Sequence, residues 1–182
     1  MQTNLTPTKF NADEFVALAK QAGMKYMIIT AKHHDGFSMF DSKATDYNIV
    51  DATPFKRDIL KELSIACQEQ GLKFGFYYSQ AQDWHHPGGL GNSWDKSFER
   101  VSSDEYVYEK ALPEVKQLLT EYGPISNFWW DTPREMTKSV VDSLHHITTH
   151  YSHGLLQTTV WATIIPEIIK LLKETGQDIN RS

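Results

Sequence analysis

The chain has 182 residues, of which 40% are hydrophobic and 23% charged, a composition typical of one globular domain with a buried core. Its net charge of -5, with no cluster of basic residues, argues against nucleic acid or an anionic membrane as a partner. Cys67 is the only cysteine, which excludes an internal disulfide, and no apolar stretch has the length of a membrane span.

The N-terminus carries no targeting signal as it is written. The segment Met1-Gln2-Thr3-Asn4 lacks the basic and apolar regions of a signal peptide. We therefore expect a soluble, cytoplasmic chain, provided that this is the natural N-terminus.

The first predicted elements are a helix, a strand and a second helix. Asn11 is suited to cap the first helix, which ends at Gly23. Residues 24–30 form an apolar run that predicts a buried strand, and the second helix ends at Gly71. Apolar residues at helical spacing are expected to face inward: Phe15, Leu18, Ala19 and Ala22 in the first helix, and Ile59, Leu63, Ala66 and Cys67 in the second.

A second strand is predicted over residues 72–78, followed by a long loop through Trp84 that is rich in Trp, His and Gly. Ser102 has the spacing of a helix cap. Pro113 interrupts the helical pattern that follows, which predicts a kink or two helices. The apolar face of this region comprises Val107, Tyr108, Ala111, Val115, Leu118, Leu119 and Tyr122.

The third predicted strand, residues 125–131, ends in the carboxylate of Asp131 next to two tryptophans. Aromatic faces suit the apolar side of a sugar ring, and a carboxylate beside them can act as acid, base or nucleophile. The alternative is that Asp131 caps a helix running from about Pro133 to His150. Gly154–Gln157 is a candidate fourth strand.

The alternation of helices and buried strands favours an α/β fold with parallel βαβ units, either a barrel or an open sheet. In a barrel, the residues that follow each strand gather on one face. These residues are His33-His34-Asp35, Tyr77-Tyr78-Ser79 and Trp129-Trp130-Asp131, which favours an active-site rim.

The adjacent histidines His33 and His34 would face opposite sides of a regular strand, which is the wrong spacing for joint metal chelation. No metal or cofactor is therefore expected. Hydrogen bonding to substrate hydroxyls and a purely structural role both remain open for these histidines.

Several motifs together resemble the α-L-fucosidase family of glycoside hydrolases, from about Phe10 to about Gln157. They are Lys-His-His-Asp-Gly-Phe (residues 32–37), Lys-Arg-Asp (56–58), Phe-Gly-Phe-Tyr-Tyr-Ser (74–79), Tyr-Gly-Pro (122–124) and Trp-Trp-Asp (129–131). The resemblance implies a retaining hydrolase of α-L-fucosides on fucosylated glycans. It also implies that residues 1–157 are an incomplete (β/α)8, TIM-like barrel with about three to four parallel βα units.

By this resemblance Asp131 matches the family's nucleophile, while His33 and His34 match residues that hold fucose hydroxyls. Tyr77 (or Tyr78, since the register is open) and Trp129 match the wall of the sugar pocket. Trp84 is a candidate for the pocket rim.

The acid/base carboxylate of the family cannot be identified in this chain. Glu135 is too close to Asp131 in sequence, and Glu167 and Glu174 lie in an unmatched tail, residues 158–182. The family's first strand would precede Met1. We therefore expect very slow turnover or none from this chain alone. Members of the family are often secreted, periplasmic or lysosomal, which leaves the localisation open.

The tail from Thr158 departs from the family's typical Asn-Asn-Arg-Leu-Gly continuation. Inserting one base after the codon of Gln157 permits that continuation, so a shifted reading frame is our hypothesis for the tail. Two alternatives to an active hydrolase stay open. One is a non-catalytic, fucose-binding remnant, and the other is a non-functional fragment that self-associates through open barrel edges.

Overall fold

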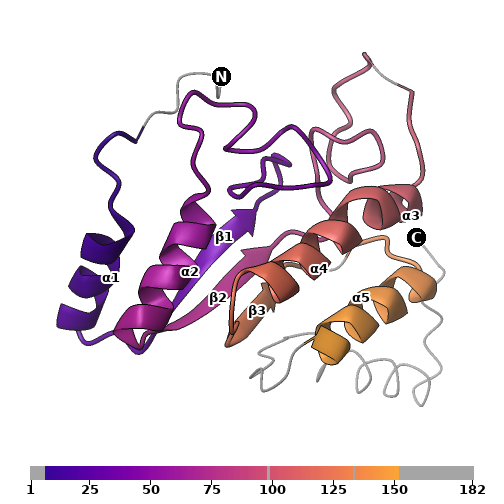
Figure 1. Ribbon diagram of the computed structural model, residues 1–182. Helices are drawn as coiled ribbons and strands as arrows, with labels where there is room; N and C mark the ends of the chain where they lie inside the picture. Colours follow the sequence, from indigo (N-terminus) through magenta and orange to yellow (C-terminus); the bar gives the residue numbers. More distant parts are fainter. Residues whose placement is uncertain (1–6, 98, 133, 152–182) are drawn as a thin grey trace.

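The computed structural model describes residues 7–97, 99–132 and 134–151, in which three parallel strands alternate with helices (Figure 1). The candidate fourth strand and the tail lie outside these ranges. The strands are β1 (Tyr26–Lys32), β2 (Lys73–Tyr78) and β3 (Asn127–Trp130). The helices are α1 (Ala12–Gln21), α2 (Ile59–Gln70), α3 (Ser103–Tyr106), the π-helix η2 (Val107–Ala111), α4 (Leu112–Glu121) and α5 (Lys138–Tyr151).

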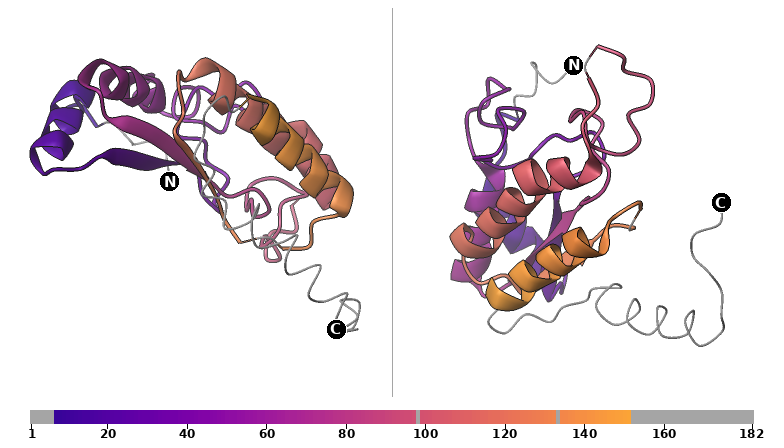
Figure 2. Two further views of the ribbon diagram at one scale, coloured as in Figure 1. Left: turned by 90° about the horizontal axis from the view of Figure 1, so that it is seen from below. Right: turned by 90° about the vertical axis from the view of Figure 1, so that its right-hand side faces the viewer.

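The sheet has the order β1-β2-β3, with both pairs parallel, which confirms the prediction of βαβ units. The helices cover one face of the sheet (Figure 2). Phe76, Tyr78 and Phe128 are buried. Tyr77 and Trp129 are paired across β2 and β3, and strand alternation turns them toward the opposite face. That face is more open, since Trp129 is 49% exposed.

Helix α1 is capped as predicted, because the Asn11 side chain accepts hydrogen bonds from the N–H groups of Asp13 and Glu14. The prediction that Phe15 and Leu18 face inward is wrong, since they are 52% and 65% exposed. The buried stripe instead comprises Ala12, Val16 and Ala19. Small residues at this stripe let α1 lie close to α2, with which it packs.

Helix α2 confirms its prediction closely. Ile59, Leu63, Ala66 and Cys67 are all buried. Gly71 follows the helix with a φ of +70°, in the left-handed region that glycine adopts without strain.

The helical region after Ser102 runs without a break through α3, η2 and α4, so the alternative of two helices separated at Pro113 is wrong. Proline has no N–H to donate to the preceding turn, and the wider π-helical turn lies immediately before α4. Six of the seven residues predicted to face inward are buried, but Tyr108 is 43% exposed. Its hydroxyl lies 3.1 Å from Oγ of Ser139 on α5 instead.

Helix α5 begins at Lys138, so the predicted start at about Pro133 is wrong. Glu135 has a φ of +51°, which is incompatible with a helix through this segment. Asp131 is therefore separated from α5 by an irregular segment, and the helix-capping role for Asp131 is wrong. Across the described ranges, no helix has both the length and the apolar character to cross a bilayer.

Candidate active site

The C-terminal ends of the three strands bring His34 and Asp131 together. Nε2 of His34, after β1, lies 3.4 Å from Oδ2 of Asp131, after β3, and each side chain is 21% exposed. On its other side, Nδ1 of His34 lies 2.9 Å from Oγ of Ser79, after β2. The three strand ends thus meet at one place, as the sequence predicted.

The electrostatics around His34 favour a neutral imidazole. Partial burial lowers the pKa of His34, and the neighbouring His33 lowers it further, whereas Asp131 acts in the opposite direction. A neutral imidazole donates one hydrogen bond and accepts another, which suits it to a polar site beside a carboxylate.

Tyr77 faces this site from β2. Burial raises the pKa of the Tyr77 hydroxyl, and its hydrogen bond to the Asp131 carboxylate raises it further. The ring stacks on His33, with centroids 5.6 Å apart. Tyr78 is fully buried on the other face of the sheet. Of the two registers that the sequence left open, Tyr77 is therefore the residue on the site face.

His33 and His34 lie beyond the end of β1, so the alternation of a regular strand does not apply to them. Their ring centroids are 4.1 Å apart, and the expectation that they face opposite sides is wrong. In the described part of the chain, no group of three or more His, Cys, Asp and Glu residues could hold a metal ion.

Tryptophans border the site. The ring centroids of Trp84 and His34 lie 5.8 Å apart, and the backbone N–H of Trp84 donates to the backbone carbonyl of His34 at 2.7 Å. The side chain of Trp129, in β3, lies on the same face of the sheet as that of Tyr77, its partner in β2. Trp94, for which the sequence carries no motif, packs edge-on against Trp84, with ring centroids 5.5 Å apart, and is 62% exposed. These rings give the site an aromatic border on two sides.

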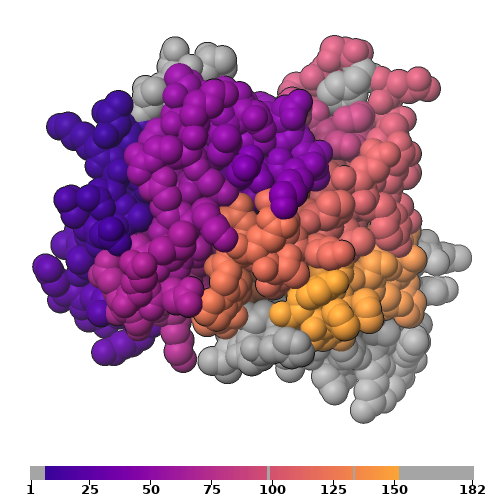
Figure 3. Space-filling model, viewed as in Figure 1, coloured from indigo at the N-terminus to yellow at the C-terminus, as the bar shows by residue number. Residues whose placement is uncertain are grey.

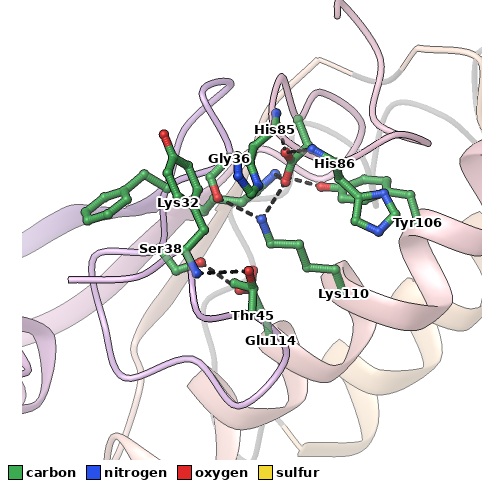
Figure 4. Close-up of polar contacts among 12 residues, drawn as sticks. Lys32, Gly36, Ser38, Thr45, His85, His86, Tyr106, Lys110 and Glu114 are labelled. Carbon is green, nitrogen blue, oxygen red and sulfur yellow. Dashed lines mark hydrogen bonds and ion pairs between the residues drawn. The ribbon is translucent and has the colours of Figure 1, made fainter. Parts of the chain in front are cut away.

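The loops that carry these residues are fixed from behind by a buried charge cluster, Lys32, Asp83, Lys110 and Glu114. All four side chains are almost fully buried. Nζ of Lys110 donates to Oδ2 of Asp83 and to the Gly36 carbonyl, each at 2.7 Å (Figure 4). Nζ of Lys32 lies 3.5 Å from the same Asp83 oxygen. The cluster thus ties the loop after β1 to the loop after β2.

Asp83 is ionised within this cluster. Burial opposes its charge, but Lys32 and Lys110 outweigh burial and lower the pKa of Asp83 to about 2. Its other oxygen accepts the N–H groups of His85 and His86 at 3.0 and 2.8 Å. Asp83 therefore sets the path of the loop that follows Trp84.

Gly36 is required at this point of the loop after β1. Its φ is +80°, and a Cβ there would lie 2.1 Å from Oδ1 of Asp83. A side chain at position 36 would push Asp83 away from its partners.

Glu114 anchors the loop after β1 to α4. One oxygen accepts the hydroxyls of Ser38 and Ser42, both at 2.6 Å, and the other accepts that of Tyr78 at 2.5 Å. In the space-filling view of Figure 3, the segment that follows β1 lies against the region of η2 and α4. The sequence gives no signal for this cluster, because isolated charged residues are usually solvated.

Comparison with known proteins gives one consistent match. A family model described as alpha-L-fucosidase matches residues 1–167. Among curated relatives, rat plasma alpha-L-fucosidase is 38% identical over 121 residues, which are 65% of this chain and 25% of that protein. Rat tissue alpha-L-fucosidase is 30% identical over 152 residues, 83% of this chain and 31% of that protein. The chain thus spans between a quarter and a third of these two relatives.

Solved structures agree. Alpha-L-fucosidase AlfC from Lactobacillus casei, in complex with α-L-fucose product, superposes with a TM-score of 0.79 at 40% identity. The match covers 84% of this chain and 51% of that one. A mutant of that enzyme has been solved with 4-nitrophenyl-α-L-fucopyranoside and with Fucα(1,6)GlcNAc. The predicted incomplete (β/α)8-like barrel is therefore confirmed.

Proposed function

Because the chain belongs to the α-L-fucosidase family, we propose that it carries the nucleophile and part of the fucose pocket of a retaining fucoside hydrolase. Asp131 is the nucleophile, and the substrate is a terminal α-L-fucosyl residue of a glycan or oligosaccharide. The observation that carries this proposal is the meeting of Asp131 with His34 and Tyr77 at the carboxyl ends of the strands.

The reaction follows from the chemistry of such a carboxylate. The Asp131 oxygen attacks the anomeric carbon of fucose, and the bond to the leaving oxygen breaks as that oxygen takes up a proton. Water then hydrolyses the resulting glycosyl ester, which releases fucose and regenerates the carboxylate. The Tyr77 hydroxyl donates to Asp131 and so holds it in place before the attack.

His33, His34, Trp84 and Trp129 are the proposed sugar contacts. The imidazoles supply donors and acceptors for the ring hydroxyls, and the indole faces suit the apolar side of the ring. The half-exposed Trp129 leaves its surface available to a ligand.

Retaining chemistry requires a second carboxyl group about 5–5.5 Å from the first, and this residue is unassigned here. We propose that this chain alone therefore hydrolyses ordinary fucosides very slowly or not at all. Fluoride needs little protonation to depart, so a 2-deoxy-2-fluoro-α-L-fucosyl fluoride tests the nucleophile without its partner.

The test is covalent labelling of the purified chain by this reagent, followed by peptide mass spectrometry. We expect one fucosyl adduct on Asp131. Labelling of another residue would contradict the assignment of Asp131, whereas saturable fucose binding without any adduct would favour the fucose-binding remnant.

A further inference from the structure

Gln80 makes an unusual contact with the candidate nucleophile. Its side-chain Nε2 donates to the backbone carbonyl of Asp131 at 2.8 Å. Its Oε1 accepts the backbone N–H of the same residue at 3.0 Å. One primary amide thus pairs with both polar backbone groups of Asp131, as a neighbouring strand would do.

The position of Gln80 explains why such a contact is needed. Strands β2 and β3 end at Tyr78 and Trp130, and the last contact between their backbones runs from Asp131 N–H to the Tyr78 carbonyl at 3.3 Å. The Gln80 amide extends the pairing by one residue beyond the strand ends.

Fixing both backbone groups of Asp131 fixes the direction of its Cα–Cβ bond. This direction decides where the carboxylate lies relative to Nε2 of His34, which is 3.4 Å away. Gln80 is itself only 2% exposed, so its side chain is held by its surroundings. Productive attack demands placement to within about 0.5 Å, which a freely rotating loop residue does not provide.

We propose that Gln80 is a positioning residue, whose side-chain amide holds the backbone of Asp131 so that its carboxylate is aimed at the site. The effect on chemistry rests on the proposed function, whereas the hold on the backbone does not. Gln80 touches neither the sugar nor the reacting atoms in this scheme.

The chain offers a matched control in Gln117 of α4. Its Nε2 donates to the Asp41 carbonyl at 2.7 Å, and its Oε1 accepts the Lys43 N–H at 3.1 Å. It is 7% exposed and contacts none of the candidate site residues in this way. Gln117→Ala therefore removes an equivalent pair of backbone hydrogen bonds elsewhere.

The experiment compares the full chain with Gln80→Ala, Gln80→Glu and Gln117→Ala, each checked for folding by circular dichroism. Gln80→Glu keeps an acceptor for the Asp131 N–H but loses the donor to its carbonyl. The first readout is labelling by 2-deoxy-2-fluoro-α-L-fucosyl fluoride. We expect both Gln80 variants to lower the maximal labelling rate about tenfold or more, with little change in the half-saturating concentration. Gln117→Ala should label like the parent chain.

The second readout is hydrogen exchange at the Asp131 amide, which does not depend on any activity. We expect exchange about tenfold faster or more in Gln80→Ala, and unchanged exchange in Gln117→Ala. Equal labelling rates in the parent and both Gln80 variants would overturn the proposal, as would unchanged exchange at Asp131.

Failure of the proposed function has a different signature. If the parent chain takes no label, Asp131 is not a nucleophile in it, and the exchange readout alone decides on Gln80. Faster exchange in Gln80→Ala then still supports the hold on the Asp131 backbone.

Discussion

Nε2 of His34 and Oδ2 of Asp131 lie 3.4 Å apart, although β2 separates the strands from which they come. The contact spans the C-terminal end of β2, where Oγ of Ser79 lies 2.9 Å from Nδ1 of His34. Asp131, 97 positions away in sequence, thus affects the pKa of His34. Substitution of either residue therefore tests the contact.

Replacement of Asp131 by Asn should abolish covalent labelling without unfolding the chain. Asparagine has the same shape and can still accept from Tyr77, so we expect a change in unfolding free energy below about 1 kcal/mol. Intact-mass spectrometry after incubation with the fluorosugar checks the labelling. Glu135→Gln is the control and should label normally; a labelled Asp131→Asn chain would exclude Asp131 as the nucleophile.

His34 should titrate below its ordinary pKa of 6.5, because burial and His33 disfavour its protonated form. The unfolded chain then binds this proton more readily than the folded one, so the contribution of His34 to stability falls as the pH drops below 6.5. NMR titration of the imidazole checks the pKa. Asp131→Asn should lower it further, since the Asp131 charge raises it. A pKa of His34 above 6.5 would contradict its partial burial beside His33.

Asp83 should make the fold sensitive to acid. Its folded-state pKa of about 2 lies below the ordinary 3.8, so its stabilisation is complete above about pH 4 and is lost as the pH falls through 2. The loss is about 2 kcal/mol for the fully buried carboxylate. Urea unfolding between these pH values measures it. Asp83→Asn should be less stable at neutral pH and should lose most of this dependence; an unchanged pH profile would argue against the ion pairs.

Trp129 and Trp130 should respond differently to replacement by alanine. Trp130 is 8% exposed, so its removal leaves a cavity and should cost about 3 kcal/mol in unfolding free energy. Trp129 is 49% exposed and should cost less than about 1 kcal/mol. Loss of its ring should instead weaken the affinity for fucose about tenfold. Thermal unfolding and NMR titration with fucose separate the two effects, and equal effects from both variants would contradict the assignment.

The outer edge of the first part of β1 should promote self-association. Within the described ranges β1 pairs with β2 on one side, and on the other the Met39 N–H covers only its end, at the Ala31 carbonyl, while Tyr26 at its start is 60% exposed. We expect the chain to elute as dimers or larger species in size-exclusion chromatography with light scattering. Tyr26→Lys should shift it toward monomers, whereas Trp94→Lys, at an equally exposed residue away from this edge, should not. A monomeric parent chain would rule out edge pairing.

The strands were predictable from local sequence signals, and the meeting of their ends was predictable from their parallel pairing. Apolar runs bounded by glycine identify buried strands, and parallel pairing sends their C-terminal ends to one face. His34, Tyr77 and Asp131 therefore came together as expected. The start of β1 was misplaced by two residues, since apolar character alone does not say where pairing with β2 begins.

The supporting residues were not predictable, because their roles depend on contacts between distant segments. Lys110 and Glu114 have the spacing of an ordinary exposed helix face, yet both are buried against the loops. Gln80 gives no signal at all, since only the end of β3 explains it. The predicted inward face of α1 was right only at Ala19, because Val16 rather than Phe15 is buried.

The buried charge cluster has a consequence for how the chain folds. Lys32, Asp83, Lys110 and Glu114 come from separate segments, and any one of them alone in an apolar core would be costly to desolvate. The segments that carry them therefore gain most by assembling together. Tyr78 donates to Glu114 and also packs against Phe128 and Trp130 of β3, so loss of one member of the cluster should also loosen the strand that precedes Asp131.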